Sequence, residues 1–177
     1  MNRPSVSRRS AACMLLVAAG TFTAAAGAGV PVVPERWTMQ NAVADCQGAL
    51  PAFEGAIRKR PTGMANEGTG NAFLTCSMQG EFVTLPAANT WFGVSISNRA
   101  AEPVTVSCTA VLGITGLQTF LTKTVTVPPG NGRRDVSWAA SVDNGNVPYG
   151  GPVNFSCALV PGSEASYTFR RFYIDET

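Results

Sequence analysis

The stretch VTVSCTAVL, residues 104–112, places a cysteine at the centre of a strand pattern. Because successive side chains of a β-strand point to opposite faces, Val106, Cys108 and Ala110 share an apolar face, and the hydroxyl-bearing residues between them share the other. The same pattern recurs in VNFSCALV, residues 153–160, where Cys157 lies on the apolar face. Both cysteines are therefore predicted to point into the core of a β-sheet protein.

The chain from residue 71 onward contains further short runs in which polar and apolar residues alternate in the same way. The predicted strands are residues 73–78, 91–97, 104–112, 118–127, 135–139, 153–160 and 167–174. They are rich in Val, Thr, Phe and Tyr, and the segments between them are built from Gly, Pro and Asn, with no apolar stripe of helical length. The pattern predicts an all-β fold, an antiparallel β-sandwich of about seven strands that is immunoglobulin-like or jelly-roll-like.

The last of these strands mixes polar and apolar residues on both of its faces. A β-bulge near Arg170 and Arg171 would reconcile that pattern. We expect this strand to lie at a sheet edge, where the two positive charges would guard it against pairing with another chain.

Residues 29–70 are predicted to be a loop-rich segment packed on the sandwich, whose core is residues 71–177. The one place for a helix is residues 41–60, and Gly48, Pro51 and Gly55 interrupt it. The triplet Arg58-Lys59-Arg60 stands beside a proline and is interpreted as a solvated loop.

Residues 1–28 have the composition of an export signal. Three arginines without an acid precede the apolar run 11–19, which is shorter than the about 20 residues of a membrane-spanning helix, and small residues follow it. Cleavage after Ala26 or Ala28 fits this order, so the protein is expected to be secreted or periplasmic. No second apolar segment of spanning length follows, so no membrane span is predicted.

Removal of this segment changes the charge of the chain. It carries three of the 13 basic residues and none of the 11 acidic ones, which leaves ten bases against eleven acids. Binding to nucleic acid requires clustered Lys and Arg on one surface, so no nucleic-acid partner is predicted.

The four cysteines that remain allow three disulfide pairings. In an exported protein, Cys108 and Cys157 are most simply bridged across the interior, between the two sheets. This favours Cys46 with Cys76 as the second bridge, which would fasten the N-terminal segment to the first clear strand. Spacings of this length, without C-x-x-C or histidine, do not indicate a metal or redox site.

About the last 90 residues also resemble a loose group of uncharacterised small secreted bacterial β-sandwich proteins. The shared marks are a V-x-V-x-C strand, a Pro-Gly turn before a V-x-W strand, and a C-x-L-x-P-G segment. In this chain they are Val104, Val106 and Cys108; Pro129, Gly130, Val136 and Trp138; and Cys157, Leu159, Pro161 and Gly162. The resemblance implies structural roles for these residues and no activity.

Trp138 shares a strand face with Val136 and is predicted to be buried against the bridge between Cys108 and Cys157. The order Cys, Trp, Cys is also that of an immunoglobulin domain. This sequence departs from that pattern because the tryptophan comes late after the first cysteine, and Phe155 stands where a tyrosine corner needs a hydroxyl.

The sequence has no histidine, which removes the commonest general base and the commonest metal ligand. Serine triads and imidazole metal sites are excluded, and neither a cofactor nor a metal is predicted. A hydrolase that uses two carboxylates, such as a glycosidase, stays open as an alternative. The acids are scattered about one per turn, which is typical of solvated loop acids.

The candidate ligand contacts lie in one loop. Asp143, Asn144 and Asn146 supply polar groups in a turn that lacks the spacing of a calcium loop. Tyr149 follows in PYGGP, where a ring has less reason to be buried than Trp91, Tyr167 and Tyr173 have in their strands. The function predicted is a non-catalytic binding or structural module whose partner is a polysaccharide or another component of the cell envelope, such as an envelope protein.

Overall fold

The computed structural model describes residues 35–78, 89–113, 118–147 and 149–173, within a compact unit that spans Val33–Thr177. The predicted signal segment lies outside the described residues. Within the described ranges, no helix has both the length and the apolar character to cross a membrane.

The described ranges form strands and three very short helices. In chain order they are β1 (Glu35–Asn41), α1 (Ala42–Asp45), β2 (Cys46–Gly48), α2 (Pro51–Glu54), β3 (Ile57–Arg60), β4 (Gly63–Asn66), β5 (Ala72–Met78), β6 (Asn89–Asn98), β7 (Val104–Leu112), β8 (Thr119–Val127), β9 (Gly132–Ala139), α3 (Ala140–Asp143), β10 (Val153–Leu159) and β11 (Ser163–Tyr173).

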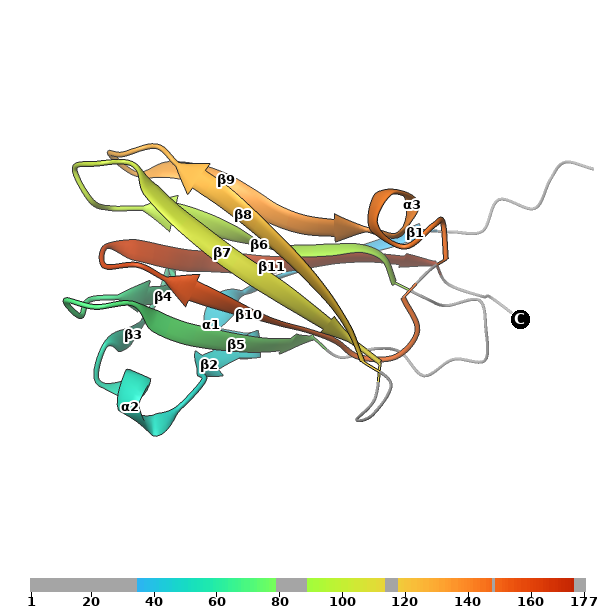
Figure 1. Ribbon diagram of the computed structural model, residues 1–177, viewed down its shortest axis with the longest axis horizontal. Helices are drawn as coiled ribbons and strands as arrows, with labels where there is room; N and C mark the ends of the chain where they lie inside the picture. The colour runs from blue at the N-terminus through green and yellow to red at the C-terminus, as the bar shows by residue number, and fades with distance from the viewer. Residues whose placement is uncertain (1–34, 79–88, 114–117, 148, 174–177) are drawn as a thin grey trace, which may run out of the picture. The chain divides into compact units, whose positions relative to one another are not determined.

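The strands make two antiparallel sheets that face each other across one core, which confirms the predicted β-sandwich (Figure 1). One sheet has the order β3-β4-β11-β6-β9, with β1 also paired to β11, and is called the six-stranded sheet. The other, called the five-stranded sheet, has the order β2-β5-β10-β7-β8. The hairpin of β7 and β8 crosses the strands of the six-stranded sheet obliquely, as expected when two twisted sheets pack face to face.

The last eight strands pair as a set of nested hairpins. β7 pairs with β8, β6 with β9, β5 with β10 and β4 with β11, so each pair encloses the one before it. In addition, β11 pairs with β6 and β10 pairs with β7, and these pairings divide the nested hairpins between two facing sheets. This is the topology of a jelly roll, so of the two predicted sandwich types the jelly roll is the observed one.

Each of the seven predicted strands is present, and β7 has the predicted bounds. The prediction for β11 was wrong in one respect, because this strand is central and not at an edge. It pairs with β1 and β4 on one side and with β6 on the other. Register shifts occur between Ala165 and Tyr167 and between Arg171 and Phe172, so a bulge near the predicted position is confirmed.

The N-terminal part was wrongly predicted to be loop-rich. It contributes β1 and β2 to the two sheets, and β3 and β4 extend the six-stranded sheet, so Arg58-Lys59-Arg60 belongs to a strand. Strands of three or four residues are too short for alternation to be visible in a sequence. The expected helical region is reduced to two single turns, of which α2 begins at Pro51, a residue whose fixed φ suits the first helical position.

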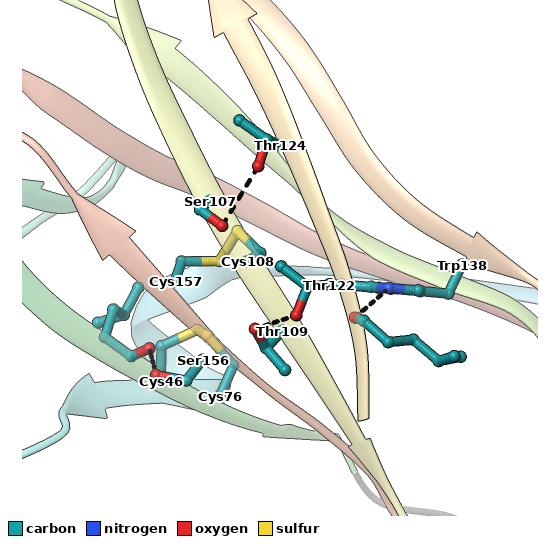
Figure 2. Close-up of a disulfide and its surroundings, with 12 residues drawn as sticks. Cys46, Cys76, Ser107, Cys108, Thr109, Thr122, Thr124, Trp138, Ser156 and Cys157 are labelled. Atoms are coloured by element: carbon teal, nitrogen blue, oxygen red, sulfur yellow. Dashed lines mark hydrogen bonds between the residues drawn. A yellow bond between two sulfur atoms is a disulfide. The ribbon is translucent and has the colours of Figure 1, made fainter. Parts of the chain in front are cut away.

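Both disulfides have the predicted partners, Cys46–Cys76 and Cys108–Cys157 (Figure 2). The expectation that the second bridge joins the two sheets was wrong. Each bridge links directly opposite residues of adjacent strands of the five-stranded sheet, β2 with β5 and β7 with β10, and the Cα atoms of each pair are 4.0 Å apart. All four cysteines are buried on the inner face of this sheet, which confirms the inward orientation predicted from alternation for Cys108 and Cys157.

The residues between these inward positions form hydroxyl pairs on the outer face of the same sheet. The Thr109 and Thr122 hydroxyls lie 2.8 Å apart, and the Thr124 hydroxyl donates to Ser107 at 3.3 Å (Figure 2). Cross-strand Thr–Thr and Thr–Ser pairs of this kind stabilise a sheet modestly.

Trp138 is fully buried, as predicted, and it closes one side of the sandwich. Its ring packs on Phe92 and Phe155, with centroid distances of 5.2 and 5.7 Å. Its Nε1 donates to the carbonyl of Leu121 at 2.8 Å, which joins β9 of one sheet to β8 of the other (Figure 2). Direct contact of the indole with the Cys108–Cys157 bridge stays a prediction.

Two buried asparagines also connect the two sheets, and they do so in equivalent ways. Asn66 ends β4 and Asn98 ends β6, and the side-chain oxygen of each accepts the backbone N–H two residues later. Each side-chain nitrogen donates to the carbonyl four residues later and to the last carbonyl of a strand in the opposite sheet, Leu159 or Val127. Two of the chain crossings from sheet to sheet, β4 to β5 and β6 to β7, are thus held by the same side-chain chemistry.

Replacement of Cys108 and Cys157 by alanine is expected to lower the free energy of unfolding by about 4 kcal/mol, because the bridge closes a loop with a sequence separation of 49. The Cys46–Cys76 pair, with a separation of 30, should contribute about 3.6 kcal/mol. Urea unfolding of both double variants measures these differences. A loss below about 1 kcal/mol for both would contradict the assigned bridges.

Asn98→Ala is expected to cost about 1–3 kcal/mol, because it leaves the buried carbonyl of Val127 and the carbonyl of Glu102 without this donor. Asn154→Ala is the matched control, since Asn154 lies half-exposed on β10. Equal stability of the two variants in thermal unfolding would argue against this role for Asn98.

Candidate functional site

At one end of the six-stranded sheet, β1 and β11 carry their apolar residues on the outer face of the sandwich. Alternation and register put Trp37 and Met39 of β1 beside Phe169 and Arg171 of β11 on that face. The intervening residues, among them Thr38, Gln40, Thr168 and Arg170, line a pocket toward the other sheet. Burial of apolar surface alone would favour the opposite arrangement. The exposure of Trp37 and Met39 therefore needs another explanation.

The outward side chains form one cluster of four aromatic rings and a methionine, here called the aromatic patch. Its members are Trp37, Met39, Trp91, Tyr167 and Phe169. The Trp37 and Trp91 ring centroids are 5.0 Å apart, with the ring planes tilted by 60°. Trp91 stacks on Phe169 at 4.2 Å. Trp37 is 58% exposed and Met39 is 67% exposed, so the patch presents large apolar side chains to solvent.

Phe169 is the buried support of the patch and depends on a glycine beneath it. A Cβ at Gly93, the residue opposite Phe169 in β6, would lie 2.7 Å from the Phe169 ring and 2.3 Å from the carbonyl oxygen of Val136. Only a residue without a side chain lets this ring lie against the sheet. The sequence of β6 thus positions Trp91 through the ring on which it stacks.

Charged groups border the aromatic patch. With the patch, Thr38 and Asp135 line a cleft of about 260 Å³. Asp135 is exposed, and within the described residues its carboxylate makes no hydrogen bond or ion pair. The Arg133 guanidinium lies 5.2 Å from the Tyr167 ring centroid, and that of Arg171 lies 5.6 Å from the Trp37 ring centroid. The cleft therefore combines flat apolar surface with a carboxylate acceptor and is bordered by guanidinium donors.

Ser95 adds a polar group to the same face. It lies in register with both Tyr167 and Asp135, two residues along β6 from Gly93. Its hydroxyl is buried and has no hydrogen-bond partner within the part of the chain that the structure describes. A buried polar atom without a partner is uncommon, and a binding surface is one place where it is found.

The pocket on the inner side of β1 and β11 is polar and measures about 270 Å³. The Thr168 hydroxyl donates to Asp45 of α1, and Arg170 Nε donates to the Thr38 hydroxyl at 2.9 Å. Asn41 starts α1 by accepting the Val43 N–H with its side chain, which brings Asp45 over this pocket. Thr38, Thr168 and Arg170 of these two strands thus make hydrogen bonds with one another or with α1.

The loop predicted to contact a ligand makes several contacts within the protein, and ligand binding by this loop stays a prediction. Tyr149 was expected to be exposed, but it is only 3% exposed, and its ring packs edge-on against Phe92 of the core at 5.2 Å. Asp143 accepts hydrogen bonds from Lys123 at 2.8 Å and from the Ala139 N–H at 2.7 Å. The loop closes over the open end of the sandwich, and an aromatic ring is the side chain that fills this space.

The turn within this loop has the predicted backbone conformation. Gly145 and Asn146 have φ values of +57° and +66°. The Asn144 side chain donates to the Val147 carbonyl at 2.6 Å, and the Asn146 N–H donates to the Ala140 carbonyl. These contacts close the turn after α3.

Acids are distributed singly over the described pockets. The cleft at the aromatic patch contains Asp135, the polar pocket contains Asp45, and two further pockets contain Glu67 and Glu164. Glycosidases commonly use two carboxylates that flank the scissile bond, and none of these pockets contains such a pair. Among the described residues, no group of three or more Cys, Asp or Glu is placed to hold a metal ion.

Sequence reasoning identified two members of the patch, Trp91 and Tyr167, and assigned both to core packing. It missed Trp37, Met39 and Asp135. The stretch RWTMQ shows Trp37 and Met39 at a spacing of two, which is the alternation of a strand. That signal gives no indication that the apolar side of this strand faces outward. The side chain of Tyr173, the remaining candidate, is not among those described.

Comparison with known proteins yields structural likenesses only. No family model and no curated protein matches the chain. A crystal structure of an exo-β-1,3-galactanase from Phanerochaete chrysosporium with galactose has a TM-score of 0.42 and 13% identity, over 76% of this chain and 29% of that chain. The chain thus spans less than a third of the galactanase.

Two smaller structures are covered almost in full. A CBM61 in complex with β-1,4-galactotriose has a TM-score of 0.34 and 10% identity, over 79% of this chain and 88% of that one. A CBM4 structure has a TM-score of 0.32 and 11% identity, over 78% and 86%. At these identities and TM-scores the comparisons assign neither a family nor a ligand to the chain.

Burial, with a smaller contribution from the negative charge of Asp143, raises the pKa of Tyr149 to about 12 from its ordinary value of 10.0. Below pH 10 the hydroxyl is neutral in both the folded and the unfolded chain, and the stability that it contributes is fully present. Between pH 10 and 12 only the unfolded chain ionises, so this stability is lost as the pH rises, by about 1.4 kcal/mol at pH 11.

Tyr149→Phe should remove the loss of stability at high pH that is due to this hydroxyl. It should leave stability at pH 8 almost unchanged, because the hydroxyl has no described hydrogen-bond partner. Chemical unfolding of both proteins at pH 8 and pH 11 measures the difference, and the ionisation of the other tyrosines cancels in the comparison. An identical pH dependence of the two proteins would rule out the elevated pKa.

Proposed function

We propose that this protein is an exported, non-catalytic module that binds a glycan on the outer face of its six-stranded sheet. The observation that carries the proposal is the inside-out placement of β1 and β11, which exposes Trp37 and Met39 while polar residues line the interior. A fold selected for stability alone would bury the rings, and departures from local consistency concentrate at functional sites. The buried disulfides agree with an oxidising, extracytoplasmic setting.

The chemistry of the aromatic patch suits a sugar. A pyranose ring has an apolar face of C–H groups, which packs on an aromatic ring, and a rim of hydroxyls that both donate and accept hydrogen bonds. Trp37 and Trp91 supply tilted ring surfaces, and Asp135 supplies an acceptor at the side of the same cleft. Sites that combine apolar walls with a few placed polar groups are the usual form of small-ligand sites.

The non-catalytic part of the proposal rests on the single carboxylate of this cleft. With Asp135 as its one described acid, the cleft supplies a hydrogen-bond acceptor and lacks the second carboxylate of a glycosidase. Turnover of a glycan that is abolished by Asp135→Asn would favour the hydrolase alternative.

The test is a binding screen of the purified mature protein against envelope and plant-type polysaccharides, followed by calorimetry with the best oligosaccharide. Trp37→Ala should weaken binding about tenfold or more, which corresponds to about 1.4 kcal/mol or more, with little change in thermal stability because the ring is mostly exposed. Asp135→Asn should weaken it as well, because the charged acceptor is lost.

Phe120→Ala is the matched control, since Phe120 is 62% exposed on β8 of the other sheet. This variant should bind as the wild type does. Equal losses in Trp37→Ala and Phe120→Ala, or a screen without any bound glycan, would refute the assignment of the site.

A further inference from the structure

The outer face that carries the aromatic patch continues along β6 and β11 into a second hollow, here called the polar groove. It has a volume of about 610 Å³ and is lined by Arg60, Pro61, Thr62, Ser97, Arg99, Asn131, Glu164 and Ser166. Ser97 lies on the same face of β6 as Trp91 and Ser95. Tyr167 of the patch directly follows Ser166 of the groove, so the two hollows adjoin. Because a strand rises about 3.3 Å per residue, Trp91 in the patch and Ser97 at the edge of the groove lie roughly 20 Å apart along β6, which is the length of several sugar residues.

The acidic and basic side chains of the polar groove lie at different depths below the surface. Arg99 and Glu164 form an ion pair at 3.3 Å, and the carboxylate side chain is only 5% exposed whereas that of Arg99 is 41% exposed. The acid is therefore beneath the surface and the guanidinium is at the surface. One Arg99 nitrogen is occupied by Glu164, and a guanidinium has five N–H donors, so Arg99 is oriented by its partner and can still donate to a ligand.

The other arginine of the groove is held in the same manner. Arg60 and Arg58, on β3, both pair with Glu67, and the Nε of Arg60 is buried without a hydrogen-bond partner in the described part of the chain. The carboxylates thus fix the arginines in place, while the open surface of the groove presents guanidinium groups.

Arg133 connects the groove to the aromatic patch. It lies opposite Ser97 in the pairing of β9 with β6, and its guanidinium is over the Tyr167 ring. It is exposed, and within the described residues no carboxylate pairs with it. A guanidinium held against an aromatic ring at the junction of two hollows is positioned to bind an anionic group of a ligand that spans both.

We infer that the ligand of this face is an acidic glycan, whose chain extends from the aromatic patch into the polar groove and whose carboxylate or sulfate groups bind Arg133 and Arg99. This inference rests on the proposed function, since it names the class of glycan for the same face. Arginine suits the role because its planar fork donates two parallel hydrogen bonds to a carboxylate or sulfate. The patch supplies the stacking surface, and the arginines supply selectivity for charge.

The experiment compares acidic oligosaccharides with counterparts from which only the charge has been removed. Uronic-acid oligomers are paired with their carboxyl-reduced forms, and sulfated oligomers with their desulfated forms, which also distinguishes the two sources of negative charge. Binding by calorimetry should be about tenfold or more tighter for the acidic member of at least one pair, because charge-assisted hydrogen bonds are lost with the charge. This advantage should shrink as salt is raised.

Arg133→Gln should bind the acidic member more weakly and so lose most of the advantage. Arg134→Gln is the matched control, because Arg134 is its exposed neighbour on β9 and lies on the opposite side of the strand, away from Tyr167. Arg99→Gln should also reduce the advantage, and its thermal unfolding is measured because it leaves the buried Glu164 without its partner.

The outcomes separate the two proposals. Equal affinity for acidic and charge-free members of every pair would overturn the acidic-glycan inference and leave glycan binding at the patch in place. An acidic preference that Arg133→Gln and Arg99→Gln both retain would overturn the assignment to these arginines. No binding of any oligosaccharide would overturn the inference together with the proposed function.

Discussion

The covalent pair of Cys108 and Cys157 sets the register of the five-stranded sheet, and much of the molecule depends on that register. A slip of one residue between β7 and β10 would turn every inner side chain outward, and the bridge between directly opposite residues prevents it. β10 in turn aligns β5, which the second bridge joins to β2. The six-stranded sheet covers the other side of the core, and Asn66 and Asn98 hold two of the crossings between the sheets.

The outer face of the six-stranded sheet is the consequence of that closure with the greatest bearing on function. β11 is central and β1 lies beside it, so residues far apart in the sequence meet in one surface that runs from Trp37 to Asp135. Gly93 leaves room for Phe169, and Phe169 supports Trp91. The exposed rings therefore rest on a rigid sheet and not on a loop, and a site on a rigid element loses little entropy when a ligand binds.

Much of the core could be predicted from residue type and alternation, because burial imposes a period of two wherever one face of a strand is covered. β5, β7 and β10 follow this period, and the cysteines on their inner faces are paired as predicted. The functional face could not be predicted in the same way. Residue type and spacing do not distinguish an aromatic ring on the outer face from one in the core. Trp91, half-buried on the outer face, was therefore assigned to the core, and Tyr149, in a Gly- and Pro-rich loop, to the surface.

The sequence by itself determined the all-β class, the positions of the seven longer strands and the absence of imidazole chemistry, since each follows from local pattern or composition. It also favoured, among three possible pairings, the disulfide partners that are observed. The tertiary structure alone decided that the bridges lie within one sheet, that β11 is central, and that the apolar side of β1 faces outward. Those features depend on which strands become neighbours, and neighbours are chosen by long-range pairing. A strand's own sequence specifies that it has two different faces; its partners specify which of the two meets the core.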